Sequence, residues 1–274
     1  MASSSSDLGL IAGSSQMPRI VGREARAAGR RVCAAAIHGI TDPALEECVD
    51  EMHWLQWSDL QGFFTLLQEW QAAGITEAIM AGKVEQQRMY ERDEEGEMEK
   101  LIEGLPTGHT DQLLSAVANV LAGAGIELLP STRYLGRYMP GAGQVAGRPL
   151  DDRERDDVEH GWRIAKALGT HDIGQTIVVK EKAVVAVEGM EGTDACIRRA
   201  GDLAGPGTVV IKVAKPDQDL RFDVPVVGVQ TVSAMRDAGA GALAFEAGVT
   251  VLFDKAEIET AVGDEIGLVA RADD

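Results

Sequence analysis

In the first half of the chain, short apolar runs alternate with segments whose apolar residues recur at helical spacing. Apolar runs that end at turn residues are typical of strands, and here they are Leu8–Ala12, Arg31–Ile37, Ala78–Ala81 and Glu127–Leu129. Helical segments are predicted over residues 18–28, 60–70 and 111–121. A strand, turn, helix and strand at the start, followed by further alternation, predicts a Rossmann-like α/β domain.

Residues 51–74 contain three of the four tryptophans. At helical spacing this region forms an apolar face made by Leu60, Phe63, Phe64, Leu67 and Trp70. Such a stripe usually packs into a core, and the alternative interpretation is a wall for acyl chains. Further along, Met89–Lys100 is rich in charge and predicts an exposed, mainly helical face.

Residues 132–150 differ in composition from the segments on either side. They are rich in glycine and proline, which is typical of a linker; Pro140, Gly141, Gly143, Gly147 and Pro149 are among these residues. We therefore place a domain boundary here, between an N-terminal domain over residues 1–131 and a C-terminal domain over residues 151–274. The second half again mixes strand-like and helical segments, so the fold class is α/β with two domains, the second a mixed α/β domain.

The stretch from Asp172 to Gly201 is the most promising part of the second half. Two strand-like runs, Thr176–Val179 and Ala183–Val187, flank a polar tripeptide and predict a hairpin. A turn with the sequence EGMEGTD follows at the start of a predicted helix, where Thr193 or Asp194 is the expected N-cap. A helix N-terminus favours phosphate, and adjacent carboxylates can hold a divalent cation. The residues alone also fit an ordinary hairpin and capped helix.

Three further groups of residues are candidates for contacts with an anionic ligand. The loop Gly13-Ser14-Ser15 follows the first strand, where Rossmann-like folds bind ligands, although the dinucleotide fingerprint G-x-G-x-x-G is missing. Lys83 follows a strand and can reach a phosphate. Lys212 lies in a later predicted strand, and the loop that follows concentrates charges of both signs: Lys215, Asp219, Arg221 and Asp223. The alternatives are a tight turn, a surface lysine and a solvated loop, but the charged loop and the acidic turn together suggest a metal–phosphate site.

The overall charge and the cysteines limit the classes of function. The formal net charge is −18 at pH 7, which argues against a nucleic-acid partner. The three cysteines are far apart and form no C-x-x-C pair, so we expect neither a zinc site nor a disulfide framework. We expect no signal peptide and no membrane span, because the Ser-rich start lacks a charged segment followed by an apolar core and no apolar run approaches roughly 20 residues. We expect a cytoplasmic protein, and peripheral contact with the inner membrane stays open.

Four runs carry a resemblance to a known family: GLIAGSSQMP at 9–18, DIGQ at 172–175, AVEGMEGTDA at 186–195 and KVAKPDQDLRFDVPVVG at 212–228. Their order and spacing resemble those of the UDP-2,3-diacylglucosamine pyrophosphohydrolases of the LpxI family in Gram-negative lipid A synthesis. The resemblance covers nearly the whole chain. One departure is Ser15, where the family usually has a glycine.

The resemblance implies an enzyme that hydrolyses the pyrophosphate of UDP-2,3-diacylglucosamine to 2,3-diacylglucosamine 1-phosphate (lipid X) and UMP. It also implies dependence on Mg²⁺ or a similar cation such as Mn²⁺. A homodimer, and attachment to the cytoplasmic face of the inner membrane, stay open. The alternative from another class is a non-catalytic nucleotide-sugar-binding or regulatory protein. A nicotinamide-dependent enzyme is a third interpretation, but this chain lacks the glycine fingerprint of such enzymes.

The chemistry of this reaction assigns roles to individual residues. A carboxylate must hold the metal or orient the attacking water, and two phosphate charges must be neutralised. We expect Asp223, Lys212 and Lys215 to be catalytic. The expected metal ligands are Asp223, Asp194 and Glu191. The expected substrate-binding residues are Gly13, Ser14, Ser15, Lys83, Asp111, Gln175, Glu188, Gly192, Thr193 and Arg221.

Overall fold

The computed structural model describes residues 7–83, 110–171, 173–216, 218–221 and 223–273, without the side chains of residues 110–113. The chain divides into two compact units. The first comprises Met1–Leu135 and Asp219–Phe222, and the second comprises Gly136–Gln218 and Asp223–Asp274. Within the described residues, every helix is too short or too polar to span a membrane. The predicted charged face at Met89–Lys100 lies outside the described residues.

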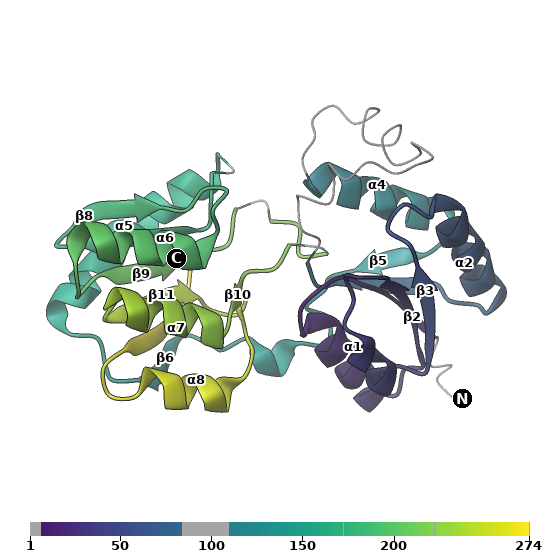
Figure 1. Cartoon of the computed structure of the whole chain (residues 1–274), viewed down its shortest axis with the longest axis horizontal. Coiled ribbons are helices and arrows are strands. Elements are labelled where there is room, and N and C mark those ends of the chain that lie inside the picture. Colours follow the sequence, from purple (N-terminus) through teal and green to yellow (C-terminus); the bar gives the residue numbers. More distant parts are fainter. Residues whose placement is uncertain (1–6, 84–109, 172, 217, 222, 274) are drawn as a thin grey trace. The chain divides into compact units, whose positions relative to one another are not determined.

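The first unit is built on a five-stranded parallel sheet with the strand order β3-β2-β1-β4-β5. Its strands are β1 (Leu8–Ala12), β2 (Val32–Ile37), β3 (Glu51–Leu55), β4 (Glu77–Ala81) and β5 (Glu127–Leu129). Helix α1 (Met17–Ala27) covers one face, and α2 (Leu60–Ala72) and α4 (Thr110–Gly123) cover the other (Figure 1). A short 3₁₀ helix, η1 (Pro43–Cys48), precedes β3. This arrangement confirms the Rossmann-like prediction.

The core under α2 shows what its apolar stripe does. Leu67 and Trp70 are 3% and 2% exposed, and both belong to the cluster that packs on β2 and β4. Gly9 lets the Trp70 ring lie on β1, because a Cβ at this position would be 2.4 Å from a ring carbon. The core interpretation is therefore confirmed for these residues. Phe64 lies outside this core and is 46% exposed.

The second unit contains a six-stranded mixed sheet with the order β6-β13-β11-β9-β7-β8. Its strands are β6 (Gly143–Gly147), β7 (Thr176–Lys180), β8 (Ala183–Val187), β9 (Val209–Lys212), β11 (Ala242–Glu246) and β13 (Gly267–Arg271). The central strands β9, β11 and β13 are parallel, whereas β6 and β7 are antiparallel to their neighbours. A separate parallel pair is formed by β10 (Val226–Val227) and β12 (Val251–Leu252).

Helices cover both faces of the second sheet (Figure 1). Helix α5 (Asp152–Gly169) packs on one face, and the other is covered by α6 (Thr193–Ala204), α7 (Val229–Ala238) and α8 (Lys255–Val262). Successive residues of β9 point to opposite faces, as a strand requires: Val210 packs under α6 and α7, and Ile211 packs under α5. The two separate sheets confirm the predicted two-domain α/β class.

The predicted linker needs correction. Residues 132–150 contain the 3₁₀ helix η3 (Gly136–Tyr138) and strand β6, which pairs with β13 at the edge of the second sheet. Gly147 has a φ of +68°, and a Cβ there would lie 1.9 Å from the carbonyl oxygen of Ile266. Gly147 thus allows close backbone packing at the edge of this sheet. The first boundary between the units lies at residues 135/136, and residues 219–222 return to the first unit.

The predicted hairpin is confirmed, and its turn is held from α5. Strands β7 and β8 pair in antiparallel fashion, and the turn residues Glu181 and Lys182 have φ values of +52° and +61°. Asp157 of α5 is fully buried and accepts hydrogen bonds from both backbone N–H groups, at 3.0 and 2.6 Å. A buried carboxylate therefore stabilises left-handed conformations that residues with a side chain rarely adopt.

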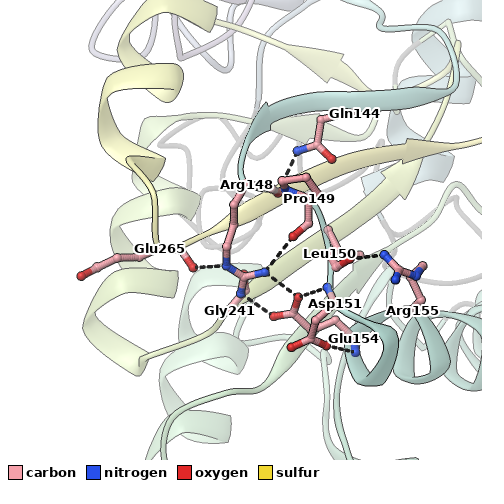
Figure 2. A network of polar contacts seen from close by, with 9 residues as sticks. All are labelled: Gln144, Arg148, Pro149, Leu150, Asp151, Glu154, Arg155, Gly241 and Glu265. Carbon is pink, nitrogen blue, oxygen red and sulfur yellow. Dashed lines mark hydrogen bonds and ion pairs between the residues drawn. The ribbon is translucent and has the colours of Figure 1, made fainter.

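A second polar network lies at the amino edge of this sheet, where β11 and β13 begin (Figure 2). Glu154 is 1% exposed and accepts hydrogen bonds from Arg148 at 2.7 and 2.6 Å. It also forms a capping box with Asp151 at the start of α5. Arg148 donates further to the carbonyl oxygens of Gly241 and Glu265, at 3.2 and 3.0 Å. The network fixes the connection between β6 and α5.

Candidate active site

Several candidate residues meet at the carboxyl edge of the second sheet. Lys212 ends β9, and Thr176 begins the antiparallel neighbour β7 directly opposite it. Strand β8 also ends at this edge, so the turn from Glu188 to Gly192 and the start of α6 lie there. Ligands of open α/β sheets bind outside the carboxyl ends of the strands. The topology thus brings the two motifs at 186–195 and 212–228 together.

Thr193 connects two charged side chains at this edge. The Lys212 ammonium donates to Thr193 Oγ1 at 2.7 Å, and this hydroxyl donates to Glu188 Oε1 at 2.9 Å. Lys212 is 7% exposed, so its charge lies almost entirely within the protein. The other oxygen of Glu188, Oε2, is buried and lacks a hydrogen-bond partner among the residues that the structure describes. Predicted residues thus form a compact cluster of both charges.

The prediction of Thr193 or Asp194 as the N-cap of α6 is wrong. The N-cap is Gly192, with a φ of +82°, and Thr193 is the first helical residue. The Thr193 hydroxyl bonds Lys212 and Glu188, and Asp194 Oδ1 accepts a hydrogen bond from Thr231 at 3.1 Å. Both side chains contact other elements instead of the N–H groups of their own helix. Sequence cannot show such long-range competition for a capping group.

Asp223 forms a second group with two of the predicted residues. Its Oδ2 accepts a hydrogen bond from Gln175 Nε2 at 3.1 Å and lies 3.8 Å from the Lys215 ammonium. The carbonyl of Gln175 accepts from the Val213 N–H at 2.9 Å, which places Gln175 beside the end of β9. The Asp223 side chain is 35% exposed. The structure therefore gives this carboxylate a cationic and a hydrogen-bonding neighbour together with access to solvent.

The three carboxylates predicted as metal ligands do not form one cage. Within the described residues, no group of three or more His, Cys, Asp or Glu side chains is arranged to hold a metal ion. The exposed Glu191 pairs with Arg199 and accepts from the Gly189 N–H at 2.9 Å. The hydrogen bond from Arg199 holds the pKa of Glu191 below its usual value. Glu191 is therefore occupied by a neighbouring cation.

Arg221 lies in the first unit, within the returning segment Asp219–Phe222. Its guanidinium contacts the carboxylate of Asp219, with Nε 2.9 Å from Oδ1 and Nη2 2.5 Å from Oδ2. This ion pair lowers the pKa of Asp219. Ser131, which is 1% exposed, anchors the segment: its N–H donates to the Leu220 carbonyl at 2.8 Å and its hydroxyl to the Arg221 carbonyl at 2.7 Å. The sequence does not reveal this role of Ser131, because the contact joins residues far apart in the chain.

The loop Gly13-Ser14-Ser15 lies at the carboxyl edge of the first sheet, beside Lys83. Strands β1 and β4 are neighbours there, at the point where the strand order reverses. Ser14 and Lys83 exchange backbone hydrogen bonds at 2.8 and 3.1 Å, and the Ser14 hydroxyl donates to the Lys83 carbonyl. A Cβ on Gly13 would lie 2.6 Å from that carbonyl oxygen. The two loops are therefore joined through their backbones.

Two further predicted residues, Ser15 and Asp111, lie in the first unit. Ser15 has a φ of +79°, in the left-handed region that favours glycine. A serine at this position, where the family usually has a glycine, therefore strains the backbone. Its hydroxyl accepts a weak hydrogen bond from the Met17 N–H at 3.3 Å. Asp111 lies in α4, but its side chain is outside the described part of the chain.

A parallel sheet in Rossmann order and a second, mixed sheet with charged side chains at its carboxyl edge define a two-domain α/β protein. Family comparison agrees with this division. Residues 7–138 match the LpxI N-terminal domain and residues 141–269 match the LpxI C-terminal domain. The chain belongs to the LpxI family, as the resemblance of its motifs implied.

One relative extends over nearly the whole length of both proteins. The UDP-2,3-diacylglucosamine pyrophosphatase LpxI of Caulobacter vibrioides is 28% identical over 272 residues, which are 95% of this chain and 95% of that protein. Among solved structures, the biotin carboxylase subunit of pyruvate carboxylase matches 73% of this chain and 42% of its own, with 11% identity and a TM-score of 0.28. The biotin carboxylase domain of the Hydrogenobacter thermophilus 2-oxoglutarate carboxylase matches 72% and 41%, with 14% identity and a TM-score of 0.23. Scores this low support no argument about fold or function.

Proposed function

We propose that this protein hydrolyses the pyrophosphate of UDP-2,3-diacylglucosamine to 2,3-diacylglucosamine 1-phosphate and UMP, a step of lipid A biosynthesis. The family and the name of the Caulobacter relative support the substrate. The observation that carries the proposal is Asp223, with Lys215 at 3.8 Å and Gln175 at 3.1 Å, at the same sheet edge as the buried Lys212. Hydrolysis of a pyrophosphate requires cations that neutralise the phosphate charge and a carboxylate that acts on the attacking water or the metal.

In this reaction the oxygen of a water bonds to one phosphorus while the bond from that phosphorus to the bridging oxygen breaks. We assign Asp223 to orienting this water and accepting its proton, because its carboxylate is partly exposed and held by Gln175. Lys212 and Lys215 neutralise the charge that develops on the phosphate oxygens. Neither lysine needs to move a proton for this role, since a fixed positive charge is sufficient.

A divalent cation fits these residues if the substrate supplies most of its ligands. Mg²⁺ is usually bound through one or two carboxylates together with phosphate oxygens and waters, so a three-carboxylate cage is not required. Asp223 is the residue we assign to the ion, and Asp194 is the second candidate. Glu191 fits less well because Arg199 already occupies it. When bound, Mg²⁺ or Mn²⁺ neutralises phosphate charge.

The proposal is tested with the purified full-length protein and UDP-2,3-diacylglucosamine, followed by separation of UMP and 2,3-diacylglucosamine 1-phosphate. We expect both products with Mg²⁺ or Mn²⁺, loss of both with excess chelator, and recovery when the metal is restored. Product formation in excess chelator would remove the metal from the mechanism. Binding of intact substrate without either product, at every metal concentration, would instead show a non-catalytic nucleotide-sugar-binding protein.

A further inference from the structure

The Thr193 hydroxyl has three polar neighbours in the second unit. Lys212 Nζ is 2.7 Å away, Glu188 Oε1 is 2.9 Å away, and Thr176 Oγ1 is 3.3 Å away. These neighbours come from three different places: the end of β9, the turn after β8 and the start of β7. Thr193 itself is the first residue of α6. One hydroxyl thus joins four segments at the carboxyl edge.

The number of hydrogens fixes the direction of each bond. An ammonium group only donates, so Thr193 accepts from Lys212. A carboxylate only accepts, so Thr193 gives its single hydroxyl hydrogen to Glu188. The contact with Thr176 can then be a hydrogen bond only if Thr176 is the donor. Thr193 therefore uses its one donor inside the protein and has none left for a phosphate oxygen.

We propose that Thr193 is a positioning residue, which holds the Lys212 ammonium in place and does not bind substrate through its hydroxyl. This inference rests on the proposed function, in which Lys212 neutralises phosphate charge. It differs from the expectation that Thr193 contacts the substrate directly.

The burial of Lys212 explains why a positioning group is useful. Lysine has a flexible four-carbon stem and three rotatable donors, so its charge is poorly directed by itself. Lys212 is only 7% exposed, and its bond to Thr193 fixes how the other two ammonium hydrogens are oriented. Thr193 also links this ammonium to the carboxylate of Glu188 through a single hydroxyl.

The first experiment separates positioning from direct binding by steady-state kinetics of four variants. Thr193→Val keeps the shape of the side chain and removes the hydroxyl, whereas Thr193→Ser keeps the hydroxyl. We expect Thr193→Val to lower kcat roughly 10- to 100-fold, the scale of a misplaced catalytic group, with KM within about threefold of wild type because ground-state binding is retained. Thr193→Ser should stay close to wild type.

The double variant decides whether Thr193 acts through Lys212. If it does, Thr193→Val lowers activity no further once Lys212→Met has removed the ammonium, because the two changes remove the same interaction. A direct substrate contact gives the opposite pattern: a raised KM in Thr193→Val, and effects of the two changes that multiply in the double variant. That pattern would overturn the proposal.

A second measurement is independent of catalysis. In ¹⁵N-lysine-labelled full-length protein, the ammonium signal of Lys212 is assigned by its loss in Lys212→Met, and its motion is followed by nuclear relaxation. We expect a rigid ammonium in wild type and Thr193→Ser, and a mobile one in Thr193→Val. An equally rigid ammonium in Thr193→Val contradicts the inference. If wild type releases no UMP, the proposed function fails, while this measurement still decides the role of Thr193.

Discussion

The second unit has two polar networks at opposite edges of one sheet, and they differ in how their charges are matched. At the amino edge, Glu154 accepts two hydrogen bonds from Arg148 and a third from the Asp151 N–H. At the carboxyl edge, the Thr193 hydroxyl lies between Lys212 and Glu188, and Asp223 lies 3.8 Å from Lys215. The first arrangement pairs its charges directly, and in the proposed function the second turns its charges toward a ligand. Breaking a directly paired buried charge is strongly destabilising, whereas charged groups at a functional site act on the ligand.

The largest expected effect comes from Asp223. Asp223→Ala should lower turnover at least roughly 100-fold, the scale of a lost general base or electrostatic group. Substrate binding should be retained or become tighter, because a carboxylate beside two phosphates repels them. Turnover and binding are compared with wild type at saturating Mg²⁺, and Asp202→Ala on the exposed side of α6 serves as the control. Near-normal turnover of Asp223→Ala would mean that Asp223 is only a surface group, and it would contradict the catalytic role proposed for the carboxyl edge.

The amino edge should respond in the opposite way. Glu154→Gln removes the charge that Arg148 and the capping box require, and we expect a loss of about 2–3 kcal/mol in the free energy of unfolding, as for a hydrogen bond to a charged group. Its kcat and KM should not change. Glu159→Gln is a matched control on the same helix: Glu159 also pairs with an arginine, Arg271, at 2.6 Å, but it is 62% exposed. Exposed pairs contribute little, so a large loss in this control would contradict the explanation by burial.

The same pair predicts how stability depends on pH. Burial raises the pKa of Glu154, but the hydrogen bonds from Arg148 and the Asp151 backbone outweigh it and hold the pKa below its ordinary value of 4.5. A carboxyl group with a lowered pKa in the folded state stabilises the fold above 4.5 and loses this contribution as the pH falls through the folded-state value. Denaturant unfolding of wild type and Glu154→Gln should therefore converge below pH 4.5. A difference that stays constant on acidification would mean that the charge of Glu154 is not responsible.

Ser131 tests whether the carboxyl-edge site depends on the first unit. Its buried hydroxyl contacts the carbonyls of Arg221 and Met80, so Ser131→Ala should cost about 1 kcal/mol of unfolding free energy. Amide hydrogen exchange in residues 219–221 should become faster. We expect kcat within about threefold of wild type, because Gln175 and Lys215, which contact Asp223, both belong to the second unit. A kcat loss as large as that of Asp223→Ala would show that the anchored segment sets the position of the carboxylate.

The sequence predicts the parts of the fold that depend on local pattern. Strands β1 and β2 and the hairpin of β7 and β8 are apolar runs between turn residues, and each lies where it was expected. Strand β3 was missed because its residues, EMHWL, are mostly half-exposed and lack a clear alternation. Strand β6 was mistaken for a linker because it begins and ends with glycine, and of these Gly147 serves close packing. The return of residues 219–222 to the first unit depends on a distant serine, which no local pattern reveals.

The candidate site shows the same limit. The motifs at 186–195 and 212–228 lie at strand ends, so their meeting at one sheet edge follows from topology. Individual roles do not follow, because they depend on partners far away in sequence. Thr193 is hydrogen-bonded to Lys212, which lies 19 residues later in the chain. Asp223 is hydrogen-bonded to Gln175, which lies 48 residues earlier. Composition shows which charges are present, but only the fold shows which of them cancel.

The smallest effect is expected for Glu191. This residue lies at the carboxyl edge of the second sheet, but it is paired with an arginine, as Glu154 is at the amino edge. Arg199 and the Gly189 N–H hold its carboxylate, and the side chain is exposed. A carboxylate in this position should contribute little to a metal site. Glu191→Gln should therefore leave kcat, and the Mg²⁺ concentration for half-maximal activity, within about threefold of wild type, as expected for a surface ion pair. A true ligand behaves differently, since its loss weakens the metal site and raises the Mg²⁺ requirement while saturating Mg²⁺ restores much of the rate. A Mg²⁺ titration of Glu191→Gln beside wild type distinguishes these cases. A Mg²⁺ requirement raised roughly tenfold or more is the loss typical of disturbed metal coordination. That result would return Glu191 to the metal site and mean that the ion displaces Arg199 when it binds.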